Sequence, residues 1–272
     1  MSIIYFIGAG PGDAELITVK GARLLGAADV VVYAGSLVDR ELVCKYAPQA
    51  EAHDSAGLTL AETTALLARA VAAGKRAVRL HTGDPSLYGA IQEQMLELDR
   101  LDIAYEVTPG VTSAFAAAAA LGQELTLPEV SQTVIITRLA GRTPVPERER
   151  LAELAKIAAT LVIYLSVGMI EEVVAELLQG AYGTATPVAV VAKASWPDEQ
   201  VIEGTLADIA AKVRSAGVDR QAVIIVGDVL RARQEGLGAV SRLYADDFVH
   251  GFRSQSAEGP LPTSQPPAPE QP

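Results

Sequence analysis

Cysteine is almost absent from this sequence of 272 residues, in which Cys44 stands alone. One cysteine cannot form a disulfide within the chain, and it excludes a zinc site made of four cysteines. This usage fits the reducing environment of the cytoplasm, where we expect the protein to be located. Histidine is also scarce. His53, His81 and His250 lack the spacing of metal ligands, so we expect no metal site.

Basic residues are outnumbered by acidic ones, with 22 Lys and Arg against 33 Asp and Glu and a formal net charge of −11. Proteins that bind nucleic acids normally neutralise the phosphates with a basic surface, and the sequence has no run of basic residues. We therefore expect no nucleic acid partner. A local basic pocket is still compatible with this composition.

Long hydrophobic runs are missing as well. The most apolar stretches, residues 114–121 and 160–167, are much shorter than the roughly 20 residues that cross a bilayer. Residues 1–6 lead directly into a strand-like segment, without the basic start and the longer apolar stretch of a secretory signal. We expect neither a membrane partner nor export.

Complete nucleotide-binding motifs are also lacking. Gly8 and Gly10 occupy the first two glycine positions of the dinucleotide fingerprint, but Asp13 stands at the third. Ala34 and Gly35 follow the second expected strand, where a nicotinamide enzyme needs an acidic residue for the ribose. The segment around residue 74 lacks the upstream glycine and the hydroxyl residue of a P-loop. The turn at residues 8–13 is thus either a ligand loop of another kind or an ordinary tight turn.

Strands and helices alternate along the chain, and half of the residues are hydrophobic. We expect strands at residues 3–7, 29–33, 76–81, 103–107, 133–137, 161–165, 188–192, 201–204 and 222–226. We expect helices at residues 16–24, 59–74, 88–100, 112–121, 149–158, 170–178 and 206–215. The alternation predicts an α/β fold with a mainly parallel sheet that helices cover on both faces.

The alternation is interrupted at residues 123–131, and we place a domain boundary there. This predicts an N-terminal α/β domain of residues 1–122 and a C-terminal α/β domain of residues 123–240. The last two expected strands form either a βαβ unit or an antiparallel pair. Residues 251–272 contain six prolines and few charges, which predicts a disordered tail.

Three loops follow expected parallel strands, at residues 8–13, 81–89 and 108–113. Ligands of parallel sheets bind outside the carboxyl ends of the strands, so we expect these loops to face one region. We interpret His81 as a structural histidine. Asp84 is a candidate general base, but an Asp-Pro pair also forms turns, and we favour the turn. Thr112 or Ser113 can cap the next helix, and such a hydroxyl can also touch a ligand.

In this order and spacing, the three loops resemble those of the S-adenosylmethionine-dependent tetrapyrrole methylases. The resemblance is carried by Gly8-Ala9-Gly10-Pro11-Gly12-Asp13, Gly83-Asp84-Pro85 and Pro109-Gly110-Val111-Thr112-Ser113. It covers roughly residues 1–230. Residues 81–85, 137–138, 141–146 and 193–199 most resemble the branch of this family that methylates carbon C11 of a cobalamin precursor.

The resemblance implies two α/β domains, the second with a mixed sheet, and a cofactor in the cleft between them. It also implies a homodimer that takes S-adenosylmethionine, releases S-adenosylhomocysteine and acts on a tetrapyrrole. Carried over position by position, the cofactor contacts fall on Pro11, Thr82, Gly83, Asp84, Leu87, Thr112, Ser113, Leu165 and Ala194. Leu165 stands where relatives often have methionine.

A tetrapyrrole with many carboxylates requires local positive charge in a chain of net charge −11. Arg138 and Arg142 lie beside a rigid, proline-containing segment at residues 143–146, and the planar guanidinium suits carboxylates. We expect both to bind substrate, with ordinary surface arginines as the alternative. Tyr33 and Tyr88 are expected to flank the cleft, where we favour core packing over stacking on the macrocycle or hydrogen bonding to it; Tyr88 is kept as a candidate for substrate binding.

The implied chemistry needs alignment more than a nucleophile, because the methyl group of S-adenosylmethionine is already activated. Asp84 is the one candidate catalytic residue. Three other functions stay open. They are methylation of another ring position, as in precorrin-3 or uroporphyrinogen, a nicotinamide-dependent oxidoreductase, and a tetrapyrrole carrier without catalysis.

Overall fold

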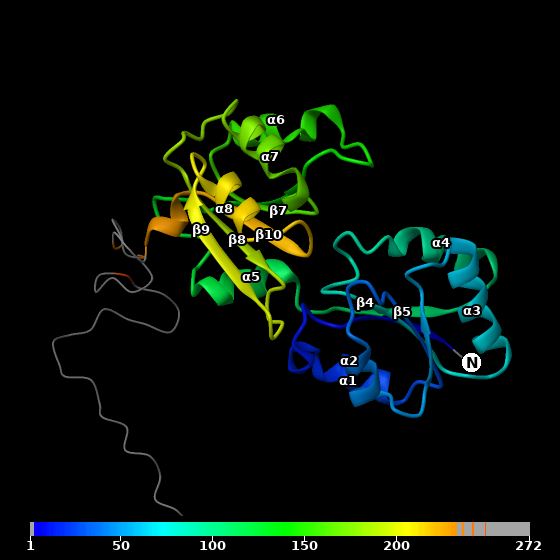
Figure 1. Ribbon diagram of the computed structural model, residues 1–272. Coiled ribbons are helices and arrows are strands. Elements are labelled where there is room, and N and C mark those ends of the chain that lie inside the picture. The colour runs from blue at the N-terminus through cyan, green and yellow to red at the C-terminus, as the bar shows by residue number, and fades with distance from the viewer. Residues whose placement is uncertain (1–2, 233–235, 237–240, 242–247, 249–272) are drawn as a thin grey trace, which may run out of the picture.

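The computed structural model describes residues 3–232, 236, 241 and 248 and consists of two lobes, each built on a five-stranded sheet (Figure 1). The first lobe runs from blue through cyan to the green of β5 in Figure 1, and the second runs from green to orange. Two sheets with helices packed on them confirm the predicted α/β fold class. The predicted disordered tail at residues 251–272 lies outside the described residues.

The first lobe (residues 3–109) contains a parallel sheet with the strand order β3-β2-β4-β1-β5. Its strands are β1 (Ile4–Gly8), β2 (Val30–Tyr33), β3 (Glu51–Asp54), β4 (Ala77–His81) and β5 (Tyr105–Thr108). Its helices are η1 (Ala14–Leu16), α1 (Val19–Gly26), α2 (Arg40–Tyr46), α3 (Leu60–Ala72) and α4 (Ile91–Arg100). Two elements, α2 and β3, were not predicted from the sequence. Strand β3 is a largely exposed edge strand, so it carries no hydrophobic pattern.

Alternate residues of the parallel strands face opposite sides of the sheet. Phe6 and Val32 pack in one core with Leu67 of α3 and Leu98 of α4. Ile7 packs in a second core with residues of α1 and α2 on the other face. Helices therefore cover both faces, and the loops at the carboxyl ends of the strands are the part of the sheet edge that can meet the second lobe.

Helix starts in this lobe follow local side-chain and backbone chemistry. A capping box begins α3, where Glu62 N donates to Thr59 Oγ1 at 3.3 Å and Thr59 N donates to Glu62 Oε2 at 2.8 Å. The hydrogen bond from the Thr59 backbone lowers the pKa of Glu62. Helix α4 begins at Ile91 and not at residue 88, because Tyr88 and Ala90 have φ values of 57° and 49°.

The second lobe (residues 113–232) contains a mixed sheet with the order β6-β7-β10-β8-β9, in which only β6 and β7 pair in parallel. Its strands are β6 (Val134–Arg138), β7 (Thr160–Tyr164), β8 (Pro187–Ala192), β9 (Gln200–Thr205) and β10 (Ala222–Val226). The last two strands run parallel to each other and are joined through α8, as the βαβ alternative predicts, but β8 lies between them and is antiparallel to both.

The helices of the second lobe divide between the two faces of its sheet. They are α5 (Ser113–Leu121), η2 (Glu147–Glu149), α6 (Leu151–Ala155), η3 (Val167–Met169), α7 (Ile170–Leu177), α8 (Ile209–Ser215) and η4 (Asp228–Arg231). Leu151, Val173 and Ile209 place α6, α7 and α8 in the core on one face. Helix α6 is shorter than the expected helix at residues 149–158, since a 3-10 turn precedes it.

Helix α5 covers the other face, where its alanines pack with Val162, Val191 and Ile225. By packing, the second lobe therefore begins at Ser113, whereas the sequence places the domain boundary after residue 122. Helix α5 lies between the two sheets in the sequence, and its small alanine side chains can pack on either sheet. The sequence therefore does not predict which sheet it covers. In Figure 1, α5 lies beside the second sheet and directly follows the connection between the lobes.

Residues 3–232, 236, 241 and 248 offer neither a membrane-spanning helix nor a metal-binding cluster. No helix in it combines the length and the apolar character needed to cross a bilayer. No group of three or more His, Cys, Asp or Glu side chains in these residues could hold a metal ion. Cys44 is exposed on α2 as a free thiol.

Candidate functional site

Three loops meet at the carboxyl edge of the first sheet. They follow β4, β1 and β5, which are consecutive neighbours in the sheet. Gly83 N donates to the Gly10 carbonyl at 2.8 Å, and Gly10 N donates to the Gly83 carbonyl at 3.3 Å. These bonds join loop 9–13 to loop 82–89. The expectation that these loops face one region is confirmed.

Glycine is required where the three main chains cross. A Cβ atom on Gly110 would lie 2.1 Å from the Gly83 carbonyl oxygen, and one on Gly8 would lie 2.5 Å from the same oxygen. No side chain fits in either place. Gly83 itself has a φ of 57°, and a Cβ there would lie 3.7 Å from the Thr112 Cα. The surface around Gly83 therefore consists largely of main-chain atoms.

Asp84 ties two of these loops together. Its carboxylate accepts hydrogen bonds from Ser86 N at 2.8 Å, from the Ser86 hydroxyl, and from Gly110 N at 2.8 Å. Partial burial raises the pKa of Asp84, but the hydrogen bonds from Ser86 and Gly110 outweigh it and leave the pKa below its usual value. An ionised carboxylate with these donors suits the turn role that the Asp-Pro pair predicts better than the role of a general base.

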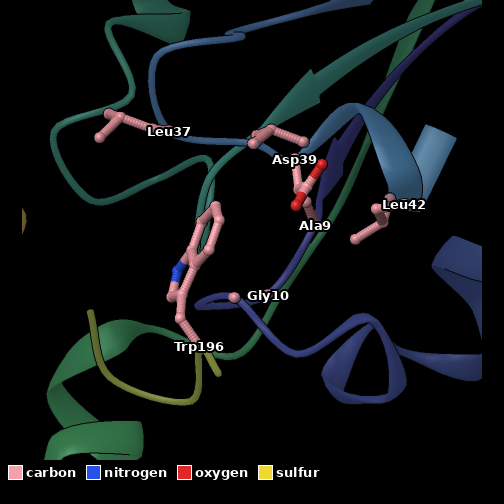
Figure 2. A pocket seen from close by; sticks show the side chains of 8 residues that line it. Ala9, Gly10, Leu37, Asp39, Leu42 and Trp196 are labelled. Atoms are coloured by element: carbon pink, nitrogen blue, oxygen red, sulfur yellow. The ribbon is translucent and has the colours of Figure 1, made fainter. Parts of the chain in front are cut away.

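Loop 193–199 of the second lobe packs against loop 9–13. Trp196 Nε1 donates to the Pro11 carbonyl at 2.9 Å, and Asp13 N donates to Ser195 Oγ at 3.0 Å. The indole lies so close to Gly12 that a Cβ there would be 2.2 Å from Trp196 Cδ1. Figure 2 shows the indole beside Gly10, with Asp39 and Leu42 across a small hollow. The single tryptophan of the chain thus joins the two lobes.

Thr112 is the N-cap residue of α5, but its side chain does not cap the helix. Its hydroxyl lies 2.6 Å from the hydroxyl of Tyr164, which also accepts a hydrogen bond from Ala114 N at 2.7 Å. The phenol of β7 therefore takes the place of the cap that the sequence assigns to Thr112 or Ser113. Thr112 and Ser113 lie beside the Gly83 loop, with the Thr112 hydroxyl held by Tyr164.

Aromatic and basic residues from both lobes line the same region, Tyr88 from the first lobe and Arg138, Tyr164 and Leu165 from the second. Tyr88 is 45 % exposed, and its ring lies 5.6 Å from that of Tyr164. Partial burial raises the pKa of Tyr88, against a lowering by the nearby charge of Arg138. Arg138 is in register with Tyr164 at the ends of β6 and β7, so both side chains leave the same face of the sheet. Leu165 follows with a φ of 54° and is 66 % exposed.

The two candidate arginines differ in what they contact. Arg138 donates to the carbonyls of Thr143 at 3.0 Å and Pro144 at 2.6 Å, and so shapes its own loop. Arg142 is exposed on that loop, and no contact within the described residues joins it to the other candidate positions. The structure thus places Arg138, but not Arg142, beside the candidate site.

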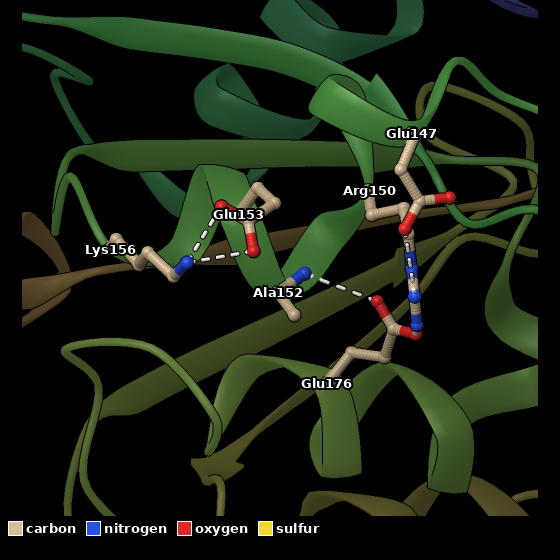
Figure 3. Close-up of polar contacts among 6 residues, drawn as sticks. All are labelled: Glu147, Arg150, Ala152, Glu153, Lys156 and Glu176. Carbon is tan, nitrogen blue, oxygen red and sulfur yellow. Dashed lines mark hydrogen bonds and ion pairs between the residues drawn. The ribbon is translucent and has the colours of Figure 1, made fainter.

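An ionic network anchors loop 139–150 at the end of the loop that leads into α6 (Figure 3). Arg150 contacts Glu147 at 3.2 Å and Glu176 at 3.1 Å, and Glu176 also accepts a hydrogen bond from Ala152 N at 3.1 Å. An open cavity of about 510 Å³ lies beside this network. It is lined by Leu139, Ala140, Pro144, Val145, Glu147, Arg150, Leu151, Met169, Glu172 and Glu176. Three carboxylates against one guanidinium make it a poor site for a polycarboxylate.

His81 lies beneath the site and not in it. The imidazole is 5 % exposed, and its ring lies 5.9 Å from that of Phe6 in a stacked arrangement. Burial, helped by the charge of Arg79, lowers the pKa of His81 to about 3, so the ring is neutral at physiological pH. These contacts favour the structural role that the sequence analysis preferred.

Most of the predicted cofactor positions come together. Pro11, Thr82, Gly83, Asp84, Leu87, Thr112 and Ser113 lie on the three crossing loops, and Ala194 lies on the loop that contacts Pro11. The sequence analysis missed Trp196 and Tyr164. The sequence signal for Trp196 is that the only tryptophan of the chain stands in a loop segment and not in an apolar run. Tyr164 is a hydroxyl-bearing residue at the end of an otherwise apolar strand.

Comparisons with known proteins agree with this arrangement. The profile of the tetrapyrrole (corrin/porphyrin) methylases matches residues 3–210. The chain is 53 % identical over 250 residues to a cobalt-precorrin-4 C(11)-methyltransferase of Methanocaldococcus jannaschii, covering 92 % of this chain and 95 % of the relative.

Two solved structures are similar to this one. One is a cobalt precorrin-4 methyltransferase of cobalamin biosynthesis, with a TM-score of 0.81 and 49 % identity, over 84 % of this chain and 95 % of that one. The other is the uroporphyrin-III C-methyltransferase of Thermus thermophilus complexed with S-adenosylhomocysteine. It has a TM-score of 0.73 and 33 % identity, over 85 % of this chain and all of the other. The second structure indicates which small molecule to test in the crossing loops.

Proposed function

The chain belongs to the tetrapyrrole (corrin/porphyrin) methylases, and on that premise we propose that it transfers a methyl group from S-adenosylmethionine to carbon C11 of precorrin-4 or cobalt-precorrin-4. This is a step of cobalamin biosynthesis. The relative and the structural neighbour that carry the precorrin-4 name are each about half identical to this chain and cover most of it. The identity to the uroporphyrin enzyme is lower, which favours the precorrin-4 position over that alternative.

The observation that carries the proposal is the crossing of three glycine loops opposite Thr112. The three atoms nearest to a Cβ built on Gly83 are all main-chain atoms, Thr112 Cα at 3.7 Å, Val111 O at 3.8 Å and Ser113 N at 3.9 Å. Such a surface offers amide and carbonyl groups at close range, as a compact adenosyl group with several polar atoms requires. The residues present therefore fit the proposed methyl donor.

When bound, S-adenosylmethionine supplies a methyl group that is already activated on a sulfonium. The chain then has to hold the two reactants in line, which can lower the barrier by several kcal/mol, on the order of 7 at best. We assign the donor to Pro11, Thr82, Gly83, Asp84, Leu87, Thr112, Ser113, Leu165 and Ala194. Asp84 acts here by fixing the loops through Ser86 and Gly110, without taking a proton.

We assign the tetrapyrrole to the part of the same region where Tyr88 of the first lobe faces Arg138 and Tyr164 of the second. Tyr88 offers an exposed aromatic face, and Arg138 supplies positive charge within electrostatic reach of it. A guanidinium next to an aromatic ring suits a flat macrocycle that carries carboxylates. Arg142, exposed on the same loop, would reach a carboxylate at the rim. This local charge answers the conflict with the net charge of −11.

Two further expectations stay proposals. The family resemblance supports a homodimer, and sedimentation velocity of the purified chain would measure it. The single free cysteine supports a cytoplasmic location. Fractionation of the source cells would test the second proposal.

The experiment that tests the function is methyl transfer with ¹³C-labelled S-adenosylmethionine. The chain is incubated with precorrin-4 and, in parallel, with its cobalt complex. NMR of the product should locate the label on C11. A label on another carbon would favour the alternative ring positions. Binding of NADH in place of S-adenosylhomocysteine would instead support an oxidoreductase, and tetrapyrrole binding without transfer would support a carrier.

A further inference from the structure

Tyr164 occupies a central position in the candidate site, although the family resemblance gives this residue no role. It ends β7, next to Arg138 in register on β6. Its hydroxyl contacts Thr112 and Ala114 at the start of α5, and its ring contacts Tyr88. The residue therefore touches the proposed donor side and the proposed tetrapyrrole side together.

The hydrogen-bond directions around its hydroxyl can be worked out. Ala114 N is a donor, so it uses one lone pair of the Tyr164 oxygen at 2.7 Å. Either hydroxyl of the pair can donate across the 2.6 Å between them; because a phenol is a stronger acid than an alcohol, we take the Tyr164 O–H as the donor and Thr112 Oγ1 as the acceptor. Thr112 then keeps its own proton for an acceptor on a bound ligand. A hydroxyl fixed in this way needs no reorientation on binding, which favours affinity.

The backbone of Tyr164 makes a second connection. Its carbonyl accepts a hydrogen bond from Ser166 Oγ at 2.6 Å, and Ser166 Oγ accepts one from Leu139 N at 2.9 Å. Leu139 follows Arg138, so the position of Tyr164 is tied to the start of loop 139–150. The ring, tilted by 49° against Tyr88, supports the exposed aromatic face from behind.

We propose that Tyr164 is a positioning residue for methyl transfer. Its hydroxyl orients the Thr112 hydroxyl toward the methyl donor, and its ring holds Tyr88 toward the tetrapyrrole. The inference rests on the proposed function, but it concerns a residue to which that function gives no role. Because the hydroxyl acts on donor binding and the ring acts on tetrapyrrole binding, substitutions can separate the two effects.

Calorimetric titration of the full chain with S-adenosylhomocysteine tests the hydroxyl. Tyr164→Phe should weaken binding roughly three- to tenfold, the range expected for one lost hydrogen bond. Thr112→Val should weaken S-adenosylhomocysteine binding by a similar factor. The double variant should bind as tightly as whichever single variant binds less tightly, because both substitutions remove the same connection. Tyr182→Phe is the matched control. Tyr182 is buried in the same lobe and bonds the Ala159 carbonyl, so its loss should lower thermal stability and leave binding unchanged.

Steady-state kinetics test the ring. Tyr164→Phe keeps it and should leave the KM for the tetrapyrrole unchanged, whereas Tyr164→Leu should raise that KM. Unchanged binding by a folded Tyr164→Phe variant, or additive losses in the double variant, would overturn the inference and leave the proposed function standing. A wild-type chain that does not bind S-adenosylhomocysteine would instead overturn the proposed function, and the inference with it.

Discussion

His81 couples the stability of the first lobe to pH. Its pKa is about 3 in the folded chain because of burial and Arg79, and about 6.5 in an unfolded chain. Between these values the unfolded state binds a proton that the folded state does not, so this contribution is complete above pH 6.5 and is lost as the pH falls. From pH 7 to pH 5 we expect a loss of about 2 kcal/mol in the free energy of unfolding.

Urea unfolding at both pH values measures this loss. His81→Phe, which can still stack on Phe6, should have the smaller pH dependence. His53→Gln is the control and should keep the pH dependence of the wild type, since His53 lies on the edge strand and is only partly buried. An equal dependence in the wild type and in His81→Phe would assign the effect to other groups.

Arg138 tests the substrate side of the site. Arg138→Ala should raise the KM for the tetrapyrrole roughly 10- to 100-fold, the cost of a charged hydrogen bond. Binding of S-adenosylhomocysteine should not change. Arg138→Lys should recover little, because an ammonium cannot bond the Thr143 and Pro144 carbonyls and a substrate carboxylate in the same fork. Arg148→Ala, at an exposed position in the same segment, should have no effect. A parallel loss of donor binding in Arg138→Ala would contradict the assignment.

At the residue scale, the sequence was most informative where chemistry is local. The Thr59 and Glu62 capping box and the turn role of Asp84 follow from neighbours along the chain. The contact of Trp196 with Pro11 joins residues that are 185 positions apart, and no periodic pattern marks it. The same holds for Tyr164, whose role depends on a helix start 50 positions away.

The crossing loops are the element on which donor binding depends most. Gly110→Ala would place a methyl group 2.1 Å from the Gly83 carbonyl oxygen, so the loops must separate. We expect a loss of stability of about 1 to 3 kcal/mol and a loss of S-adenosylhomocysteine binding of at least tenfold. Thermal melting and calorimetry measure the two effects.

Gly57→Ala provides the comparison for this variant, because a Cβ at Gly57 has no atom within 4 Å. It should melt and bind as the wild type does. Normal binding by Gly110→Ala would mean that the crossing of the loops does not shape the donor site.

The same scale shows what periodicity can predict. The parallel strands β1, β2 and β4 follow from buried, largely apolar runs. The start of α4 does not, because the apolar spacing continues back to Tyr88 although the backbone there is left-handed. The order of β8, β9 and β10 is equally hidden, since pairing depends on contacts between whole strands. The alanines of α5 fit either sheet, so the sequence does not show that α5 packs with the second one.

At the scale of the whole molecule, Trp196 reports on the meeting of the two lobes. It is the only tryptophan, so its fluorescence comes from one place. The indole bonds the Pro11 carbonyl and covers Gly12, next to the proposed donor site. Titration with S-adenosylhomocysteine should therefore change its emission, with a midpoint equal to the calorimetric Kd. Binding by calorimetry without any change in emission would place the donor away from this contact.

The central claim is that the methyl donor binds between the lobes, on the main chains of the crossing loops. A crystal structure of the chain with S-adenosylhomocysteine tests it most directly. The account predicts density for the ligand against Gly83 and Thr112, with the sulfur facing Tyr88 and Arg138. Density on another surface, such as the cavity beside Glu172 and Glu176, would contradict it.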